Sequence, residues 1–361
     1  MKKLLCIVGG MNTGGAETFL MKVYRTLPLE NYQMDFCVTN PKKGFYDDEI
    51  LKMRGKIIHI PKKTKNPISN FINIVKIVKE GNYKNVIRIS QHSLSAIDLL
   101  AAKIGGANNL IFRSSNSNSC GNKANALIHE IFKPLAAIIP NKKIAPSNTA
   151  AIHMFGKRNY EKGKVILLNN GVPLEKFRYN KEIRQKLRKK LNIEDKFVIG
   201  HIGRFTEQKN HKFLLDVFKE YLKINNHSIL MLIGDGPLKD EVINYAQKIE
   251  VQDKIMYLGL RSDTNDLYQC MDCFVFPSLY EGMPNTVIEA QTSGLRCVIS
   301  DTITKDVKLT TRVDFCSLKD IKGWINKIAE SKDREETYKQ IKEQGYDIQD
   351  VGKKFISIAY N

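Results

Sequence analysis

Two glutamates with a helix start between them form the segment of this sequence best suited to chemistry. Glu281 follows an apolar run that ends at Phe276, and Glu289 lies eight positions further on. Pro284 is placed for the first turn of a helix, so the free N–H groups of 283–286 could hold an anion. One carboxylate could then bind sugar hydroxyls and the other a ribose diol. Two solvated surface acids are the alternative, although the neighbours of Glu289 are apolar.

A pair of cations follows another apolar run. Arg204 comes just after residues 197–202, and Lys209 follows five positions later, where the next helix is expected to begin. A bidentate guanidinium and a point-charge ammonium that converge on one site make a good clamp for a diphosphate. Two solvated cations in a lysine-rich protein explain the pattern equally well, and the spacing alone does not decide between the two.

A glycine-bearing turn follows the first apolar run of the chain. It reads GGAE at 14–17, and a helix is expected to begin near Gly15. Glycine lets the backbone approach an anion, and the N–H groups of the helix start can face a phosphate. The spacing is not G-x-G-x-x-G, which counts against a dinucleotide site.

The elements that position these residues are short apolar runs alternating with amphipathic helical runs. The runs are rich in Val, Ile and Leu and do not alternate with polar residues, as in strands that are buried on both faces. This pattern predicts parallel, doubly wound α/β sheets. Strands are expected at 4–8, 34–39, 56–60, 85–89, 110–113, 165–168, 197–202, 228–233, 255–258, 273–276 and 297–300.

The rhythm breaks at the sequence NNGVP, residues 169–173, because Gly and Pro interrupt regular structure. The chain should therefore form two Rossmann-like domains that face each other across a cleft, with ligands beyond the carboxyl ends of the strands. We expect a first domain over 1–172, a second over 173–345, and a C-terminal helix over 346–361 that packs back toward the first domain.

The net charge of +19 is concentrated in the first half of the chain. Residues 1–170 hold 26 Lys and Arg against 10 Asp and Glu, a balance of +16, which leaves +3 for the rest. A one-sided basic half predicts a polyanionic partner, such as an anionic membrane or a phosphate-bearing substrate. A general abundance of lysine is the alternative, but it should act on both halves.

Several segments bear on the location of the protein. The apolar run 4–8 near the N-terminus is too short for a secretory signal, and 126–140 is too short and too charged to span a bilayer. That second segment could be an amphipathic helix, whose apolar residues face the core more often than a membrane. The seven cysteines, including the C-x-x-C pair at 270 and 273, lie mostly in apolar runs. They are expected to be buried thiols in a reducing, cytoplasmic compartment.

Taken together, the motifs resemble those of glycosyltransferase family 4, which groups retaining enzymes of the GT-B fold, and within it the exopolysaccharide and capsule-synthesis branch. The matching stretches span nearly the whole chain, and those of the second half are the more specific. They are GGAE at 14–17, NNGV at 169–172 with Phe177, IGHIGRFTEQKN at 199–210, IGDGPL at 233–238, YLG at 257–259, and FPSLYEGMPNTVIEAQTS at 276–293.

The resemblance implies roles for individual residues. Arg204 and Lys209 would bind the donor diphosphate, Glu281 the transferred sugar, Glu289 the ribose, and Gly15 the phosphates from the opposite domain. The base would lie near residues 234, 260 and 261. The implied donor-binding residues are Gly15, Gly203, Gly234, Leu260, Arg261, Gly282, Met283, Pro284, Asn285, Thr286 and Glu289. The family works without a metal bound to a D-x-D motif, so neither a metal nor another cofactor is expected, and the cations and the helix start would neutralise the leaving diphosphate.

The sequence departs from the family at one point. Related enzymes often carry His-x-His-Asn after the fifth strand, where this chain has RSSN at 113–116. Arg113 or His92 could supply the missing role, and Asn116 is a further candidate on the acceptor side. Alternatively, His92 only caps or fills a loop.

The expected activity is transfer of a hexose or N-acetylhexosamine from a UDP-sugar to a lipid-diphosphate-linked saccharide during synthesis of a cell-surface polysaccharide. The protein would be cytoplasmic and peripherally attached to the anionic inner face of the plasma membrane. Two other classes stay open: a sugar-nucleotide epimerase or phosphorylase on the same fold, and a non-catalytic donor-binding membrane protein. No nucleic-acid partner is expected, because the chain shows neither a recognition motif nor an aromatic stacking cluster.

Overall fold

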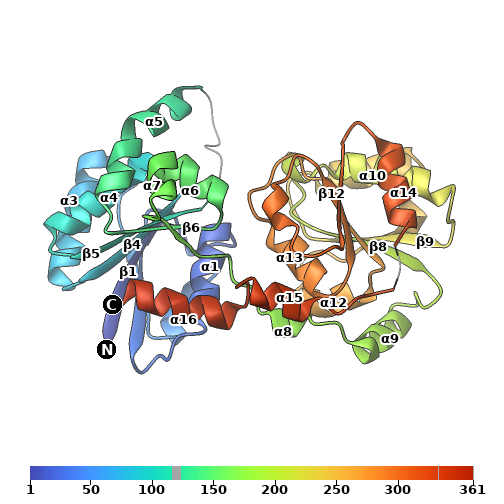
Figure 1. The fold of residues 1–361 in the computed structure, drawn as a ribbon, viewed down its shortest axis with the longest axis horizontal. Coiled ribbons are helices and arrows are strands. Elements are labelled where there is room, and N and C mark those ends of the chain that lie inside the picture. Colours follow the sequence, from blue (N-terminus) through green and yellow to red (C-terminus); the bar gives the residue numbers. More distant parts are fainter. Residues whose placement is uncertain (116–122, 332, 361) are drawn as a thin grey trace. The chain divides into compact units, whose positions relative to one another are not determined.

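The computed structural model describes residues 1–115, 123–331 and 333–360. The chain divides into two compact units (Figure 1). The first unit comprises Met1–Gly171 and Ile348–Asn361, and the second comprises Val172–Asp347. The domain boundary expected after residue 172 lies one residue from this division, and the returning segment begins at 348, where 346 was expected.

The first unit contains a parallel sheet of seven strands in the order β3-β2-β1-β4-β5-β6-β7. The strands are β1 (Lys2–Val8), β2 (Tyr32–Val38), β3 (Ile57–His59), β4 (Asn85–Ser90), β5 (Asn109–Ser114), β6 (Lys142–Ala145) and β7 (Ile166–Leu167). The helices are α1 (Gly15–Tyr24), α2 (Asp47–Lys52), α3 (Pro67–Glu80), the short η1 (Ser93–Ser95), α4 (Ala96–Ile104), α5 (Lys123–Ile138), α6 (Asn148–Phe155), α7 (Lys157–Glu161) and α16 (Ile348–Ala359).

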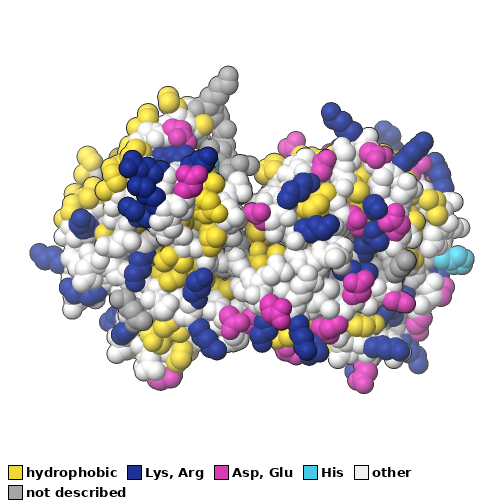
Figure 2. Space-filling view, in the orientation of Figure 1, with side chains coloured by type: hydrophobic (Ala, Val, Ile, Leu, Met, Phe, Trp, Pro, Cys, Tyr) yellow, Lys and Arg dark blue, Asp and Glu magenta, His cyan; other side chains and the backbone are white. Residues whose placement is uncertain are grey.

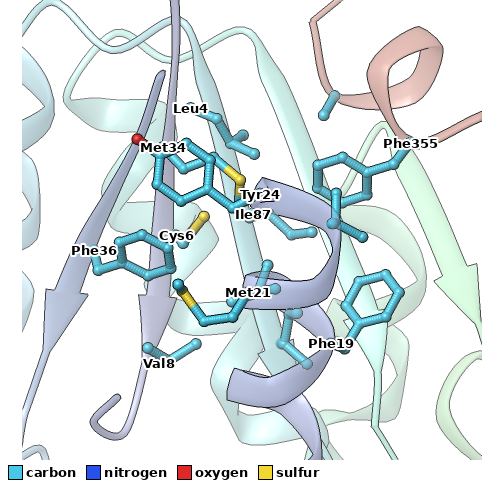
Figure 3. Close-up of a cluster of buried hydrophobic side chains, with 14 of the residues drawn as sticks. Leu4, Cys6, Val8, Phe19, Met21, Tyr24, Met34, Phe36, Ile87 and Phe355 are labelled. Atoms are coloured by element: carbon cyan, nitrogen blue, oxygen red, sulfur yellow. The ribbon is translucent and has the colours of Figure 1, made fainter. Parts of the chain in front are cut away.

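One core of this unit lies between α1, the sheet and the C-terminal helix α16. Figure 3 shows Phe19, Met21 and Tyr24 of α1 packed over Cys6 of β1, with Phe355 of α16 at the edge of the cluster. The rings of Phe19 and Phe355 meet edge to face at 6.1 Å. The carbonyls at the end of α16 accept hydrogen bonds from first-unit side chains, which satisfies groups that a helix end leaves open. The donors are Lys2, Asn109 and Lys142.

The second unit contains a parallel sheet of six strands in the order β10-β9-β8-β11-β12-β13. The strands are β8 (Phe197–Ile202), β9 (Ser228–Ile233), β10 (Ile255–Tyr257), β11 (Cys273–Phe276), β12 (Arg296–Ser300) and β13 (Val313–Cys316). The helices are α8 (Leu174–Phe177), α9 (Lys181–Lys190), η2 (Glu207–Lys209), α10 (His211–Leu222), α11 (Lys239–Lys248), η3 (Gln252–Lys254), α12 (Thr264–Cys270), α13 (Asn285–Thr292), η4 (Lys305–Val307), α14 (Ile321–Ala329) and α15 (Tyr338–Glu343).

The predicted fold class is therefore confirmed: both units are parallel sheets with connecting helices. Two strands were not predicted, and both are short. β6 begins with two lysines, and Lys143 is nevertheless buried because its ammonium donates to the carbonyl of Pro140 at 3.2 Å. β13 carries Asp314, whose carboxylate pairs with Arg296 at 2.7 Å. Polar residues that find partners inside the fold break the apolar signal from which strands are recognised.

Helix α5 contradicts the expectation that the apolar side chains of 126–140 face the core. Leu127, Ile131 and Ile138 are 63%, 61% and 76% exposed, whereas His129 and Ala136 are buried. The helix therefore packs through a histidine and an alanine and leaves its larger aliphatic side chains in solvent.

Two further observations bear on the location of the protein. In the described part of the chain, no helix combines the length and the apolar character that crossing a membrane requires. The described cysteines are all buried and unbridged, as expected for thiols that fill the core. Cys120 lies outside the described residues.

Candidate functional site

Loops at the carboxyl ends of β8, β9 and β11 are joined by backbone hydrogen bonds in the second unit. The amide of Phe205 donates to the carbonyl of Asp235 at 3.1 Å, and the amide of Leu279 donates to the carbonyl of Gln208 at 2.8 Å. The side-chain amide of Gln208 also donates to the carbonyl of Tyr280 at 2.8 Å. These bonds fix the loop 203–210 between its two neighbours, which is where a parallel sheet presents a ligand.

Lys209 and Glu281, which the sequence analysis placed in one site, are in direct contact. The Nζ atom of Lys209 lies 2.5 Å from Oε1 of Glu281, and the two side chains are only 16% and 15% exposed. The same ammonium lies 4.5 Å from the centre of the Phe276 ring, so a cation–π contact adds to the ion pair. A half-buried ion pair at a strand end is a fixed pair of charges that a polar ligand can meet.

Two glycines, Gly203 after β8 and Gly234 after β9, lie where these two loops approach each other. Gly234 has φ +138°, and a Cβ atom there would lie 2.0 Å from the carbonyl oxygen of Gly203. A Cβ atom on Gly203 would lie 2.9 Å from Nε2 of His201 and 3.3 Å from the Lys209 side chain. Only glycine at position 234 allows the two loops to approach this closely, whereas Gly203 leaves room for the side chains of His201 and Lys209.

The second glutamate is held by a tyrosine. Glu289 lies in α13, and its Oε2 accepts a hydrogen bond from the hydroxyl of Tyr268 at 3.2 Å. The single proton of this hydroxyl is shared with the carbonyl oxygen of Thr286, which lies 2.9 Å away. Burial and the nearby Glu289 carboxylate raise the pKa of Tyr268 well above its usual value, so the hydroxyl keeps its proton and remains a donor.

The start of α13 offers free donors. Pro284 is the residue that caps this helix, one position earlier than expected, and Asn285 begins it. The amides of Val287 and Ile288 both bond to the carbonyl of Pro284, which leaves those of Asn285 and Thr286 without a partner inside the helix. Met283 packs against the core of the second unit. The helix start therefore has open amides at the positions where the sequence predicts an anion site.

The remaining donor-side residues are less enclosed. Arg204 is exposed in the loop after β8, next to the buried Phe205. Leu260 is 79% exposed. Arg261 forms an exposed, bidentate ion pair with Asp263, with distances of 2.8 and 2.6 Å. Gly282 lies in the turn before α13.

Two histidines beneath the Lys209 loop were missed at the level of sequence. His201 is buried, and its Nδ1 lies 2.9 Å from the carbonyl oxygen of Val275. His211, also buried, stacks on Phe205 at 4.2 Å with 14° between the rings. Burial, with the charge of Lys209 as a second cause, lowers the pKa of His211 to about 4. The two imidazoles are therefore neutral near pH 7. They lie near Lys209 without adding positive charge to it.

In the first unit, Gly15 is the first residue of α1, and a Cβ atom there would meet nothing within 4 Å. The fold itself therefore does not require glycine at this position. The space in front of the backbone is open, as close approach of a ligand would need.

The acceptor-side candidates have partners inside the fold. The Nδ1 atom of His92 accepts the amide of Leu94 at 3.2 Å and caps η1, which is the capping alternative considered above. The guanidinium of Arg113 is buried, lies 3.6 Å from the centre of the Phe19 ring, and donates to Asn170 at 2.7 Å. Burial lowers the pKa of Arg113 to about 9. Asn116, the third candidate, lies outside the described residues.

Comparison with known proteins identifies the family. The family model described as Glycosyl transferases group 1 matches residues 183–348. The glycosyltransferase named EpsF of Bacillus subtilis (strain 168) is 32% identical, and the match covers 96% of this chain and 94% of the relative. An Escherichia coli protein named UDP-Gal:alpha-D-GlcNAc-diphosphoundecaprenol alpha-1,3-galactosyltransferase is 24% identical, covering 86% and 83% of the two chains. The capsular polysaccharide biosynthesis glycosyltransferase CapH of Staphylococcus aureus is 28% identical, covering 80% and 79%.

Among solved structures, Anabaena HepE in complex with UDP and glucose shares the fold. Its TM-score is 0.77 at 16% identity, and the match covers 99% of each chain. The paired parallel sheets, the conserved length and the EpsF match over nearly the whole chain agree with the family expected from the motifs. The protein is a glycosyltransferase, and its chain belongs to the glycosyl transferases of group 1.

Proposed function

We propose that the protein is a retaining glycosyltransferase that moves a hexose or N-acetylhexosamine from a UDP-sugar to a lipid-diphosphate-linked saccharide in the synthesis of a cell-surface polysaccharide. The observation that carries the proposal is the half-buried ion pair of Lys209 and Glu281 beside the open start of α13. This arrangement offers a cation and free amides for a diphosphate, and a carboxylate for sugar hydroxyls, within one group of loops.

The leaving diphosphate is the group that the site stabilises. Charge builds on its oxygens as the bond to the sugar breaks, and fixed donors lower the energy of that state more than that of the ground state. Lys209 supplies one such donor, the exposed Arg204 a second, and the amides of Asn285 and Thr286 two more. Glu281 then binds the transferred sugar, which suits a transition state with oxocarbenium character.

The nucleoside lies further along the same edge of the sheet. Glu289, oriented by the hydroxyl of Tyr268, would accept hydrogen bonds from the ribose diol. The base would lie beside Gly234, Leu260 and Arg261, and the amide of Gly15 would meet the phosphates. A uridine donor is supported by the name of the E. coli relative, which transfers from UDP-Gal, and by the UDP in the HepE complex.

The acceptor is proposed from the charge of the first half of the chain and from the relatives. The balance of +16 over residues 1–170 suits an acceptor diphosphate and the anionic inner face of the plasma membrane. The name of the E. coli relative specifies a diphosphoundecaprenol acceptor, and that of CapH specifies capsular polysaccharide biosynthesis. We place the protein in the cytoplasm, attached peripherally to that membrane face.

A panel of UDP- and GDP-sugars, incubated with the full chain, tests the donor. Slow release of free sugar from one UDP-sugar, with retention of configuration when a lipid-linked acceptor is added, is the expected result. Turnover of GDP-sugars alone would overturn the uridine assignment, and an epimerised donor without sugar release would overturn transfer.

The proposed chemistry needs no metal, and chelation tests this separately. Because side chains and amides neutralise the diphosphate, transfer in excess EDTA should stay within about twofold of the untreated rate. A loss that added Mg²⁺ or Mn²⁺ restores would show that a metal shares the role given to Lys209 and Arg204.

A further inference from the structure

Helix α5 carries its apolar stripe on the side opposite its packing contacts. Leu127, Ile131 and Ile138 are separated by four and seven residues, which places them on one face of a helix. His129 and Ala136 lie about half a turn away from that stripe and are the buried residues of the helix. The stripe is exposed because the helix packs through the opposite face.

Another helix of the same unit, α3, buries one of its faces in the ordinary way, although Ile68 and Ile72 near its start are exposed. In α3, Asn70, Ile74 and Val78 are buried and their spacing of four residues forms the face toward the core. Helices normally bury their apolar stripe, and a continuous apolar surface left in solvent marks an interaction site. The stripe of α5 is therefore a surface that needs a partner.

A basic groove adjoins the stripe. It has a volume of about 590 Å³, lies between α5 and α7, and includes Ile138 in its lining, so groove and stripe are continuous. One carboxylate, Glu130, faces four cations there, and it pairs with one of them, Lys133, at 3.1 Å. The other cations of the groove are Arg158, Lys162 and Lys164.

Figure 2 shows the same arrangement on the surface: hydrophobic side chains gather over α5, and a group of Lys and Arg side chains lies beside them over α7. Arg158, Lys162 and Lys164 are exposed and form no ion pair within the described part of the chain. Their charge is therefore available to an anionic partner.

We propose that α5 is the surface by which the protein lies on an anionic bilayer: the stripe enters among the acyl chains, and the groove holds lipid phosphodiester headgroups. A helix in the plane of a bilayer needs an apolar face bordered by cations, and α5 with its groove supplies both. A nucleic acid would use the cations but leave the aliphatic side chains without a contact. The inference rests on the proposed membrane location and assigns it to particular residues.

Sedimentation of the full-length protein with vesicles tests the surface. The probe is phosphatidylcholine vesicles with about one third phosphatidylglycerol, compared with phosphatidylcholine alone. The triple change Leu127→Ser, Ile131→Ser, Ile138→Ser should reduce partitioning at least about 100-fold, because three aliphatic side chains that would be buried among the acyl chains are lost. The matched control is Ile68→Ser with Ile72→Ser on α3, where both side chains are also exposed, and it should change partitioning less than about twofold.

The groove has its own pair of variants. The change Arg158→Ser, Lys162→Ser, Lys164→Ser should weaken binding to anionic vesicles about 100-fold and abolish the preference over neutral ones. Removing three exposed lysines of α9, at 186, 189 and 190, is the matched control in the second unit and should leave binding within about threefold.

Each outcome bears on the proposal separately from the transferase activity. Equal losses in test and control variants, or no binding by the unmodified protein, would overturn the surface. Self-association of the unmodified protein that disappears in the variant with all three α5 substitutions would also overturn the proposed surface, because a second copy would then cover the stripe. Donor hydrolysis without vesicles should be unchanged in every variant. If the unmodified protein hydrolyses donors but does not bind vesicles, the proposed membrane surface is wrong and the transferase proposal is unaffected. If it binds vesicles but hydrolyses no donor, the transferase proposal is wrong and the membrane surface is unaffected.

Discussion

The two units differ in what their strand ends do with polar side chains. After β8 and β11 of the second unit, Lys209 and Glu281 meet at 2.5 Å in a half-buried position, and Arg204 beside them stays exposed. In the first unit, His92 after β4 caps a turn, and Arg113 near the end of β5 is buried against Phe19. The second unit brings charged side chains together at its strand ends, whereas the first uses comparable side chains to hold its own loops.

Activity should therefore be more sensitive to substitution in the second unit than in the first. Polar groups that already have partners in the fold contribute to stability, and their loss changes the free energy of unfolding. Groups held open at a strand end contribute to binding and catalysis, and their loss changes the rate. Substitutions of the two kinds of residue should therefore change different measured quantities.

The ion pair should give the largest effect. Lys209→Ala and Glu281→Ala should each lower the rate of transfer by at least about 100-fold, since a fixed donor to the leaving group or a sugar contact is removed. The assay is steady-state transfer, with circular dichroism to show that the fold is intact. Lys212→Ala is the matched control, because it removes an exposed ion pair with Glu241 from the same unit and should change the rate less than about twofold. Full activity in either site variant would contradict the assignment.

One glycine in each unit should give the next largest effects, on stability in the second unit and on UDP binding in the first. Gly234→Ala should destabilise the second unit by about 2–4 kcal/mol, because φ is +138° and the added atom would collide with the backbone of Gly203. Gly15→Ala should leave the melting temperature unchanged, since an added Cβ atom would meet nothing within 4 Å, and should weaken UDP binding, since the proposed phosphates would approach this backbone. Thermal unfolding and UDP titration measure the two effects. A stability loss in Gly15→Ala without a change in UDP binding would reverse this comparison.

The buried His211 should make the protein sensitive to acid. Its pKa is lowered from 6.5 to about 4 in the folded state. The unfolded state therefore binds more protons between pH 6.5 and 4, so stability falls as the pH falls through that window. At pH 4.5 the loss should be about 2–3 kcal/mol relative to neutral pH. Urea unfolding of His211→Phe should show a correspondingly flatter dependence on pH, and an unchanged slope would rule out this residue as the cause.

The smallest effect is expected at His92. Removing its cap in His92→Ala should cost about 1 kcal/mol of stability, and His92→Asn, which keeps an acceptor at the cap, should restore most of it. Transfer at saturating acceptor should stay within about threefold in both. A loss of tenfold or more in His92→Asn would instead give this histidine a part in the reaction.

The sequence was most informative where one residue type serves a single purpose. Apolar runs without alternation predicted β8, β9 and β11 residue by residue, because strands buried on both faces admit little else. The ion pair of Lys209 with Glu281 was not predicted, because the spacing in the sequence grouped Lys209 with Arg204, and the pair forms only where the loops after β8 and β11 meet. The cap formed by His92 is a local bond with the amide of Leu94, and the sequence left it open as one of two alternatives. The burial of Arg113 could not be predicted, since it depends on Phe19 and Asn170, which are distant in sequence.

For helix α5, the sequence predicts the helix but not which of its faces is buried. An apolar segment of that length ordinarily predicts a core helix, and the periodicity of its aliphatic side chains gives no sign of which face turns inward. Only the contacts made by His129, whose ring stacks on His153 at 4.3 Å, decide that the aliphatic stripe is left outside. The outcome depends on packing partners supplied by α6.

The second unit is inserted into the first, and this has a consequence for synthesis of the chain. Val172 and Asp347 form a bridge at the two ends of the second unit, whereas Gly171 and Ile348 touch within the first. Where the chain passes from one unit to the other, the two chain segments therefore contact each other within each unit. On the ribosome, the second unit is complete once residue 347 has emerged, while the first still lacks α16 and its Phe355. The usual order of domain folding from the N-terminus is thus reversed, and the first core closes last.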